Sequence, residues 1–217
     1  RDRSVSRGLG DVYKRQAPFY STLAIWVGAV VMAAMLKVTV ADSTKKILFH
    51  PKEYQLYIGR ILLLIIIGFM QSALICLGDL FFLGIQCKHP VMFVLTGMFT
   101  SFVYVNLIYA LTVSFGDIGK AIAVVLMVMQ VAGSGGTFPI QCAPKFFQVV
   151  YPLLPFTHSM NAMRECIAGF YGTTYAAEIG KLAIYLVPSL LLGLLLRKPI
   201  IKMNDAFMEK LESTHLI

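Results

Sequence analysis

Apolar residues fill most of this chain, in long stretches separated by short polar segments. Five stretches come close to 20 residues, about the length that an α-helix needs to cross the hydrocarbon core of a bilayer. They cover residues 18–36, 57–80, 91–113, 121–140 and 179–196. Because helices satisfy their own backbone hydrogen bonds in lipid, the pattern predicts an all-α fold, a polytopic membrane bundle of five transmembrane helices.

The region between the fourth and fifth stretches is apolar but broken by four prolines, Pro139, Pro144, Pro152 and Pro155. The pieces between them are too short to span a membrane, as in re-entrant or interfacial segments. After Pro155, apolar residues recur at helical spacing, and Gly169 and Gly172 end the pattern. The apolar positions are Phe156, Met160, Met163, Ile167 and Phe170, and the polar positions on the other faces are His158, Asn161, Arg164 and Glu165. We therefore expect an outer re-entrant hairpin with an amphipathic helix, and we take Pro155, Phe156 and Arg164 as its marker residues.

A glycine cluster, "VAGSGGTFPI" at residues 131–140, interrupts the end of the fourth stretch. Glycine followed by proline weakens or ends a helix at membrane depth, which is tolerated only against protein or a water-filled cavity. A phosphate-binding loop is excluded because the G-x-x-x-x-G-K-[ST] pattern is missing. Close helix packing and a cavity role both stay open. The residues concerned are Gln130, Gly133, Gly135, Gly136, Phe138 and Pro139.

Composition supports a membrane protein, since 58% of the 217 residues are hydrophobic and only 14% are charged. Soluble domains have about 25% charged residues. The formal net charge is +8, and residues 1–16 carry three of these positive charges. Residues 6–16, "SRGLGDVYKRQ", resemble the in-frame translation of a sequencing adapter. We therefore expect residues 1–16 to be an artefact and 17–217 to be the native domain, the other reading being a genuine basic tail.

The distribution of Lys and Arg predicts an orientation. If five helices alternate, ten basic residues after residue 16 fall on the side of the C-terminal tail and four on the other side. Positive charge collects on the cytoplasmic side, so the C-terminus is expected inside and residue 17 outside. An upstream membrane segment is then required, and the chain is expected to be a C-terminal fragment.

Several segments resemble the membrane region of the YhgE/Pip (phage infection protein) family, which belongs with the ABC-2 type membrane proteins. They are "LAIWVGAVV" (23–31), "FGDIGKAI" (115–122), "MQVAGSGGTFPIQ" (129–141) and "FFQVVYPLLPFTHSMNAMRECIAG" (146–169). The resemblance implies one further N-terminal helix and a large extracytoplasmic domain ahead of these five helices. It also implies an outer re-entrant hairpin before the last helix and, by analogy with ABC-2 bundles, a homodimer.

Other candidate residues follow from position. Gln71, Asp79 and Asn106 lie within apolar spans, where polar groups either join helices or line a polar path. Lys45, Lys46 and Lys52 lie in the loop where ABC-2 permeases contact an ATPase subunit, although such a loop can also simply touch anionic lipid. Cys142 and Cys166 both fall in the hairpin, so an external disulfide and free thiols both stay open.

No nucleophile–base arrangement or metal-ligand cluster is visible, so we expect no enzyme activity, no cofactor, no metal and no nucleic-acid partner. Two functions are retained for a protein of the bacterial cytoplasmic membrane. The first is a permease-like subunit for export or secretion, with the lipid bilayer and a separate ATPase subunit as partners. The alternative is a membrane anchor that displays an external domain to phage or to a type VII secretion system.

Overall fold

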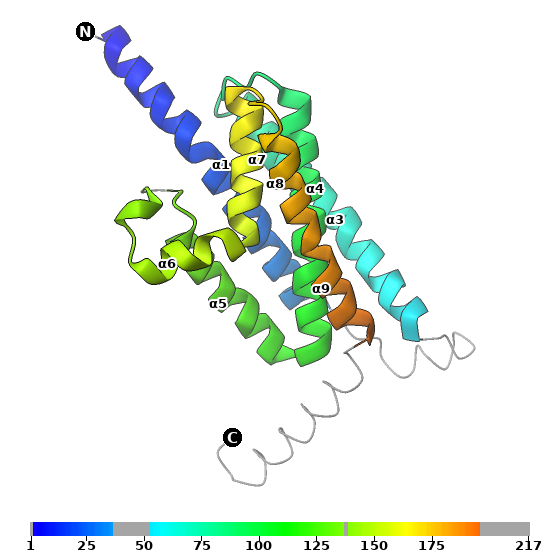
Figure 1. Cartoon of the computed structure of the whole chain (residues 1–217). Coiled ribbons are helices and arrows are strands. Elements are labelled where there is room, and N and C mark those ends of the chain that lie inside the picture. Colours follow the sequence, from blue (N-terminus) through cyan, green and yellow to red (C-terminus); the bar gives the residue numbers. More distant parts are fainter. Residues whose placement is uncertain (1, 37–52, 137–138, 196–217) are drawn as a thin grey trace.

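The computed structural model describes residues 2–36, 53–136 and 139–195, and every regular element in these ranges is a helix. Figure 1 shows a bundle of long helices, with one short-helix segment lying across its side. The all-α prediction is confirmed. The long helices are α1 (Asp2–Met35), α3 (Glu53–Phe81) and α4 (Pro90–Phe115), followed later by α8 (Thr174–Ile184), α9 (Leu186–Leu190) and a π-helical turn, η3 (Leu191–Leu195).

Four segments of the described chain are long and apolar enough to cross a membrane. They are Gln16–Met35, Tyr57–Phe81, Pro90–Phe115 and Thr174–Leu194. Each overlaps a stretch expected from the hydropathy pattern. The ends agree within a few residues because the thickness of the bilayer sets the length of an apolar helix.

The fourth expected helix is shorter than the sequence pattern suggested. It forms α5 (Asp117–Gly133), which has 17 residues and stops well before residue 140. Gly135 has φ of 64°, a left-handed conformation that glycine adopts without a steric penalty and that ends the helix. At 1.5 Å per residue, α5 is about 25 Å long, somewhat less than the hydrocarbon thickness.

Helix α4 lies at the centre of the bundle and packs against α1, α3, α5, α7 and α9. Aromatic pairs fill the space around it: the rings of Trp26 and Tyr104 lie 4.7 Å apart in an edge-to-face arrangement, and those of Tyr57 and Tyr109 lie 4.9 Å apart. The indole Nε1 of Trp26 also donates to the backbone oxygen of Ala123 at 3.3 Å. That bond joins α1 to α5 beside the aromatic cluster.

A hairpin of short helices connects α5 to α8, as the prolines predicted. It contains η1 (Ile140–Cys142), α6 (Lys145–Val150), η2 (Tyr151–Leu153) and α7 (Pro155–Ala168). Helix α7 starts at the expected proline and ends at Gly169, where φ is 106°. It packs against α1, α4 and α8, and most of its residues are buried, including His158 on the face expected to be polar.

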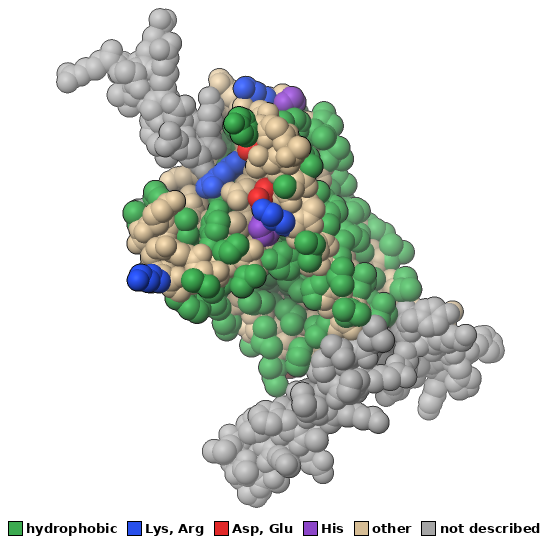
Figure 2. Space-filling view, in the orientation of Figure 1, with side chains coloured by type: hydrophobic (Ala, Val, Ile, Leu, Met, Phe, Trp, Pro, Cys, Tyr) green, Lys and Arg blue, Asp and Glu red, His purple; other side chains and the backbone are tan. Residues whose placement is uncertain are grey.

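The face of the molecule drawn in Figure 2 divides into two zones. Figure 2 shows hydrophobic side chains over the lower part of one face, whereas Lys, Arg, His and the acidic side chains gather in its upper part. Exposed apolar residues are frequent on α3, including Leu62, Ile66, Met70 and Leu74. Such a surface suits contact with lipid, and the polar zone marks the end of the bundle that carries the hairpin.

Candidate functional site

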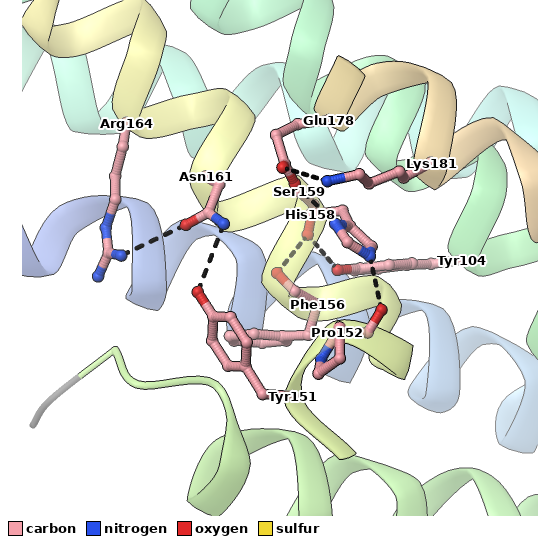
Figure 3. A network of polar contacts seen from close by, with 10 residues as sticks. All are labelled: Tyr104, Tyr151, Pro152, Phe156, His158, Ser159, Asn161, Arg164, Glu178 and Lys181. Atoms are coloured by element: carbon pink, nitrogen blue, oxygen red, sulfur yellow. Dashed lines mark hydrogen bonds and ion pairs between the residues drawn. The ribbon is translucent and has the colours of Figure 1, made fainter. Parts of the chain in front are cut away.

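A buried polar network joins the hairpin to the two long helices beside it (Figure 3). His158 on α7 lies with its Nδ1 atom 2.6 Å from Oε2 of Glu178 on α8. The other ring nitrogen, Nε2, is 3.0 Å from the carbonyl oxygen of Pro152. Lys181, one turn along α8, donates from Nζ to Oε1 of Glu178 at 3.0 Å.

The hydrogen bonds of His158 imply that one proton lies between its Nδ1 atom and the carboxyl group of Glu178. A carbonyl oxygen can only accept, so Nε2 of His158 carries a hydrogen and donates to Pro152. The Nδ1 atom then faces Glu178 either as the donor of an imidazolium to a carboxylate, or as the acceptor from a protonated carboxyl group. Both forms keep α7 bonded to α8.

A second polar contact joins α7 to the central helix. The hydroxyl groups of Tyr104 on α4 and Ser159 on α7 are hydrogen-bonded to each other, and Ser159 also donates to the backbone oxygen of Phe156 at 2.9 Å. Both Tyr104 and Ser159 are fully buried. Adjacent residues of one turn therefore hold α7 to α4 through Ser159 and to α8 through His158.

The first turn of α7 also contacts α1. Phe156, one of the expected hairpin residues, is buried with its ring centroid 5.5 Å from that of Phe19. Pro155 is buried at the first position of the helix, where its missing N–H needs no partner. The hairpin thus enters the bundle on the side of α1 and α5, and its helix then runs along α4 and α8.

The glycine cluster permits the end of α5 to approach this hairpin and α1 closely. A Cβ atom built on Gly133 would lie 3.1 Å from the ring of Phe147 and 3.2 Å from Leu154. One built on Gly136 would lie 2.0 Å from the ring of Phe19. Gly135 takes the left-handed turn between them. Gly133 and Gly136 therefore allow close packing at this corner. Phe138 lies outside the described residues.

Three buried polar side chains lie near this corner without a hydrogen-bond partner in the described part of the chain. They are Gln130 on α5, Ser134 at its end and Thr157 on α7. Gln130 precedes Gly133 by about one turn, and Thr157 follows Leu154, the neighbour of Gly133, by about one turn. Unsatisfied polar groups at membrane depth are costly, so this corner is a candidate contact point for water or another polar group.

Comparison with known proteins identifies the family. Residues 10–196 match the family described as ABC-2 family transporter protein. This chain belongs to that family. It is also 27% identical over 152 residues to "Uncharacterized protein YhgE" of Bacillus subtilis (strain 168). That match covers 70% of the chain but only 19% of the relative, so the chain spans about a fifth of that protein's length. No solved structure matches.

The resemblance found in the sequence is thereby confirmed, and the chain is a multi-pass membrane protein with an ABC-2 transporter membrane domain. In the ABC-2 domain, the residues predicted to mark the hairpin and the end of the fourth helix do not all lie together. Of the hairpin residues, Phe156 contacts Phe19 of α1 and Pro155 is buried at the start of α7, whereas Arg164 lies further along α7, partly buried. Pro139 is exposed just before η1.

The polar residues of the spans mainly join helices in this ABC-2 domain. Gln71 donates from Nε2 to the backbone oxygen of Ala24 at 3.2 Å, and its amide fills the space over Gly28. Ser21 donates to the carboxylate of Asp79, which gives a second link between α1 and α3. Asn106 donates to the oxygen of Phe102 on its own helix at 2.7 Å.

The structure describes the candidate cysteine pair but not the candidate coupling lysines. The disulfide between Cys142 and Cys166 is not formed, because both are free thiols, Cys142 exposed in η1 and Cys166 buried in α7. The Sγ atom of Cys166 instead lies 3.4 Å from Oγ1 of Thr96. The candidate coupling residues Lys45, Lys46 and Lys52 lie outside the described residues.

The central pair of the site, His158 and Glu178, was not predicted from the sequence. Glu178 was not singled out, because it stands one residue before the expected last span, 179–196. His158 was noted only as part of an amphipathic helix. One feature of the sequence could have indicated Glu178: it stands three residues before Lys181, so the two can pair on one helix face. A short turn brings that helix, α8, back beside α7.

Proposed function

We propose that this chain is the membrane permease part of an ABC-2 exporter or secretion apparatus in the bacterial cytoplasmic membrane, driven by an ATPase on a separate chain. The observation that carries the proposal is the hairpin of an ABC-2 family member, which enters the bundle after the glycine-rich end of α5 and is held to α4 and α8 by polar bonds. Such a hairpin can close one end of the bundle, and that end can open when the polar bonds to α4 and α8 break.

In this proposal α5 and the glycine-rich segment after it form a fifth membrane crossing. The hairpin then faces the outside and the C-terminus the cytoplasm, as the excess of Lys and Arg on the C-terminal side favours. The partly exposed Lys120, just after the α4–α5 turn, belongs to the cytoplasmic side in this arrangement. Pairing of two bundles, as expected for ABC-2 proteins, would complete the permease.

The proposed mechanism assigns a role to each part of the site. The His158–Glu178 and Tyr104–Ser159 bonds keep α7 against α8 and α4 in the closed form. Gly133 and Gly136 give the end of α5 close contact with the hairpin and α1, so that a shift of α5 is transmitted to both. The buried polar groups of Gln130 and Thr157 then become the first polar contacts of an opened path.

A second function, a membrane anchor for a large external domain, is favoured by a different observation. The similar YhgE protein is several times longer than the matched segment, since that segment covers 19% of it. In this case the bundle serves mainly as a support, and phage or secretion components bind elsewhere. We also propose that residues 1–16 derive from a sequencing adapter, which sequencing of the genomic locus will test.

The experiment that separates the two functions uses the proposed coupling loop. The tagged chain is purified from its native membrane, and ATP hydrolysis in the purified complex is measured. Lys45→Glu with Lys46→Glu should abolish the associated hydrolysis, whereas the control pair Lys202→Glu with Lys210→Glu, an equal change of charge in the C-terminal tail, should retain it. A wild-type complex that hydrolyses no ATP would contradict the permease proposal and favour the anchor.

A further inference from the structure

Arg164 on α7 has a guanidinium group that the protein itself leaves largely unused. Its only hydrogen bond in the described part of the chain runs from Nη1 to Oδ1 of Asn161, at 3.4 Å. Within the same residues no carboxylate lies within ion-pair distance of it. The neighbouring acid, Glu165, accepts instead from the backbone N–H of Tyr171 at 2.8 Å. A guanidinium has five N–H donors, so most of its capacity is available to a ligand.

Two neutral polar groups extend this cationic group into a small patch. The Nδ2 atom of Asn161 donates to the hydroxyl group of Tyr151 at 3.5 Å. Contacts of 3.4–3.5 Å are at the long limit for hydrogen bonds, so the three side chains bind one another only weakly. In Figure 3 Arg164, Asn161 and Tyr151 lie together, away from His158 and Glu178. The patch is therefore separate from the network that holds α7 in place.

The charge of the patch is positive at neutral pH. Partial burial lowers the pKa of the Arg164 guanidinium, but an arginine stays protonated in proteins. The hydroxyl of Tyr151 and the amide of Asn161 add donors that can turn to an anion. A guanidinium beside neutral donors is the arrangement that recognises phosphate oxygens.

The apolar surroundings indicate which phosphate compound fits. The preceding short helices expose Phe146 (58%), Val149 (70%) and Leu153 (68%), although a soluble protein would bury such residues. This segment follows the end of α5, where a membrane helix reaches the interface, and aromatic residues with a basic neighbour, Lys145, are typical of that depth. An occupant must therefore offer an anionic head and an apolar body side by side.

We propose that Arg164, together with Asn161 and Tyr151, binds the phosphate of an anionic phospholipid in the leaflet next to the hairpin. The acyl chains of that lipid lie against the exposed apolar side chains of α6 and η2. The bound lipid covers the hairpin and fixes its depth in the membrane. Free phosphate shares the head-group chemistry but leaves the apolar surface of Phe146, Val149 and Leu153 uncovered.

The test measures the thermal midpoint of the purified full chain in uncharged detergent as lipid is added. Phosphatidylglycerol should raise the midpoint saturably, while phosphatidylcholine and inorganic phosphate at equal concentration should raise it far less. Arg164→Gln should weaken the apparent affinity for phosphatidylglycerol about tenfold, as expected for a lost charge-assisted bond. Lys145→Gln, which removes an exposed cation from the same hairpin, is the matched control and should change the affinity little.

Three results would overturn the proposal: Arg164→Gln keeps the wild-type response, Lys145→Gln loses as much as Arg164→Gln, or inorganic phosphate reproduces the effect of the lipid. If Arg164→Gln does not fold, Asn161→Ala and Arg164→Lys are measured instead. Both should reduce the affinity severalfold, because each weakens the phosphate contacts while Arg164→Lys keeps the charge. Unchanged affinity in both would contradict the site.

Discussion

His158 and Glu178 stand 20 residues apart in the chain and 2.6 Å apart in the fold, and their contact links the hairpin to the last apolar segment. Both side chains are buried, and each has a further partner, the carbonyl of Pro152 for His158 and the ammonium of Lys181 for Glu178. A contact between two buried ionisable side chains therefore joins the hairpin to α8.

Removal of one member of this pair should destabilise the domain strongly. His158→Ala leaves Glu178 buried without its closest partner, and loss of one partner of a buried pair costs about 3 kcal/mol or more. Glu178→Gln should cost less, because the amide can still donate to the imidazole. The free energy of unfolding, measured by denaturant titration in mixed micelles, tests both.

The double variant His158→Ala with Glu178→Ala provides the control for this pair. If the two residues act together, its cost falls at least about 1 kcal/mol below the sum of the single variants. The exposed pair Asp117–Lys120 serves as a comparison, and Lys120→Gln should have no measurable effect. Strict additivity at His158 and Glu178 would mean that their contact contributes nothing.

Gly136→Ala should disturb the packing of α5 against α1. The added Cβ atom would meet the ring of Phe19, which is itself fixed by Phe156, so the ring cannot turn away at low cost. We expect a loss of about 1–3 kcal/mol of unfolding free energy, as for other overpacked sites. Gly180→Ala is the matched control, because nothing lies near that position and no loss is expected.

A compensating substitution makes this prediction more specific. Phe19→Leu opens space beside Gly136, so the combination Phe19→Leu with Gly136→Ala should recover part of the stability that Gly136→Ala loses. Thermal midpoints in the same detergent measure the recovery. A double variant that is worse than the sum of its parts would show that the two residues do not share this contact.

Gln130→Met should stabilise the domain, because it replaces a buried amide that has no partner in the described residues by an apolar side chain of similar size. The expected gain is about 1 kcal/mol. Asn106→Leu is the contrasting variant and should lose stability, because Asn106 donates to the oxygen of Phe102. Thermal unfolding of both proteins measures the two changes.

The ATP hydrolysis of the Gln130→Met variant distinguishes a permease from an anchor. In a permease, Gln130→Met should lower the ATP hydrolysis that accompanies export even as stability rises, because a polar group of the opened path is lost. In a pure anchor, the phenotype should not change. A variant that is both less stable and fully active would contradict the assignment of an unsatisfied amide.

Hydropathy was enough to predict the long helices but not the end of α5. The ends of α3 and α4 follow from the extent of apolar residues, which the membrane thickness determines. The end of α5 depends on the positive φ of Gly135, a local backbone property that an average over 20 residues cannot detect. Helical periodicity after Pro155 correctly predicted α7.

The candidate site was only partly predictable, for a similar reason. Proline, glycine and isolated polar residues are visible one at a time in the sequence, so Gln71, Asp79 and Gly136 could be selected. The pairing of His158 with Glu178 and of Tyr104 with Ser159 depends on how three helices pack, which no single segment encodes. Cys142 and Cys166 illustrate the same limit: their common hairpin left a disulfide and free thiols both open, and only the packing shows the two thiols free.

Accessibility of the hairpin thiol tests the proposed orientation. Cys142 is exposed and Cys166 is buried, so an impermeant maleimide applied to intact cells should modify Cys142 but not Cys166. In a Cys87→Ser background, which removes the partly exposed thiol of Cys87, the variant Cys142→Ser should abolish the labelling, and a reductant should change neither the labelling nor the mobility of the protein. Labelling of Cys142 only after the cells are opened would place the hairpin on the cytoplasmic side.

The most direct test of the permease account is the rate of Cys142 modification in native membranes with and without ATP plus vanadate, in a Cys87→Ser background. If an ATPase subunit moves the hairpin, trapping it should change the rate severalfold, and Lys45→Glu with Lys46→Glu should remove that change. An identical rate in both states, with Cys142 fully accessible throughout, would contradict a moving hairpin and leave the bundle as an anchor.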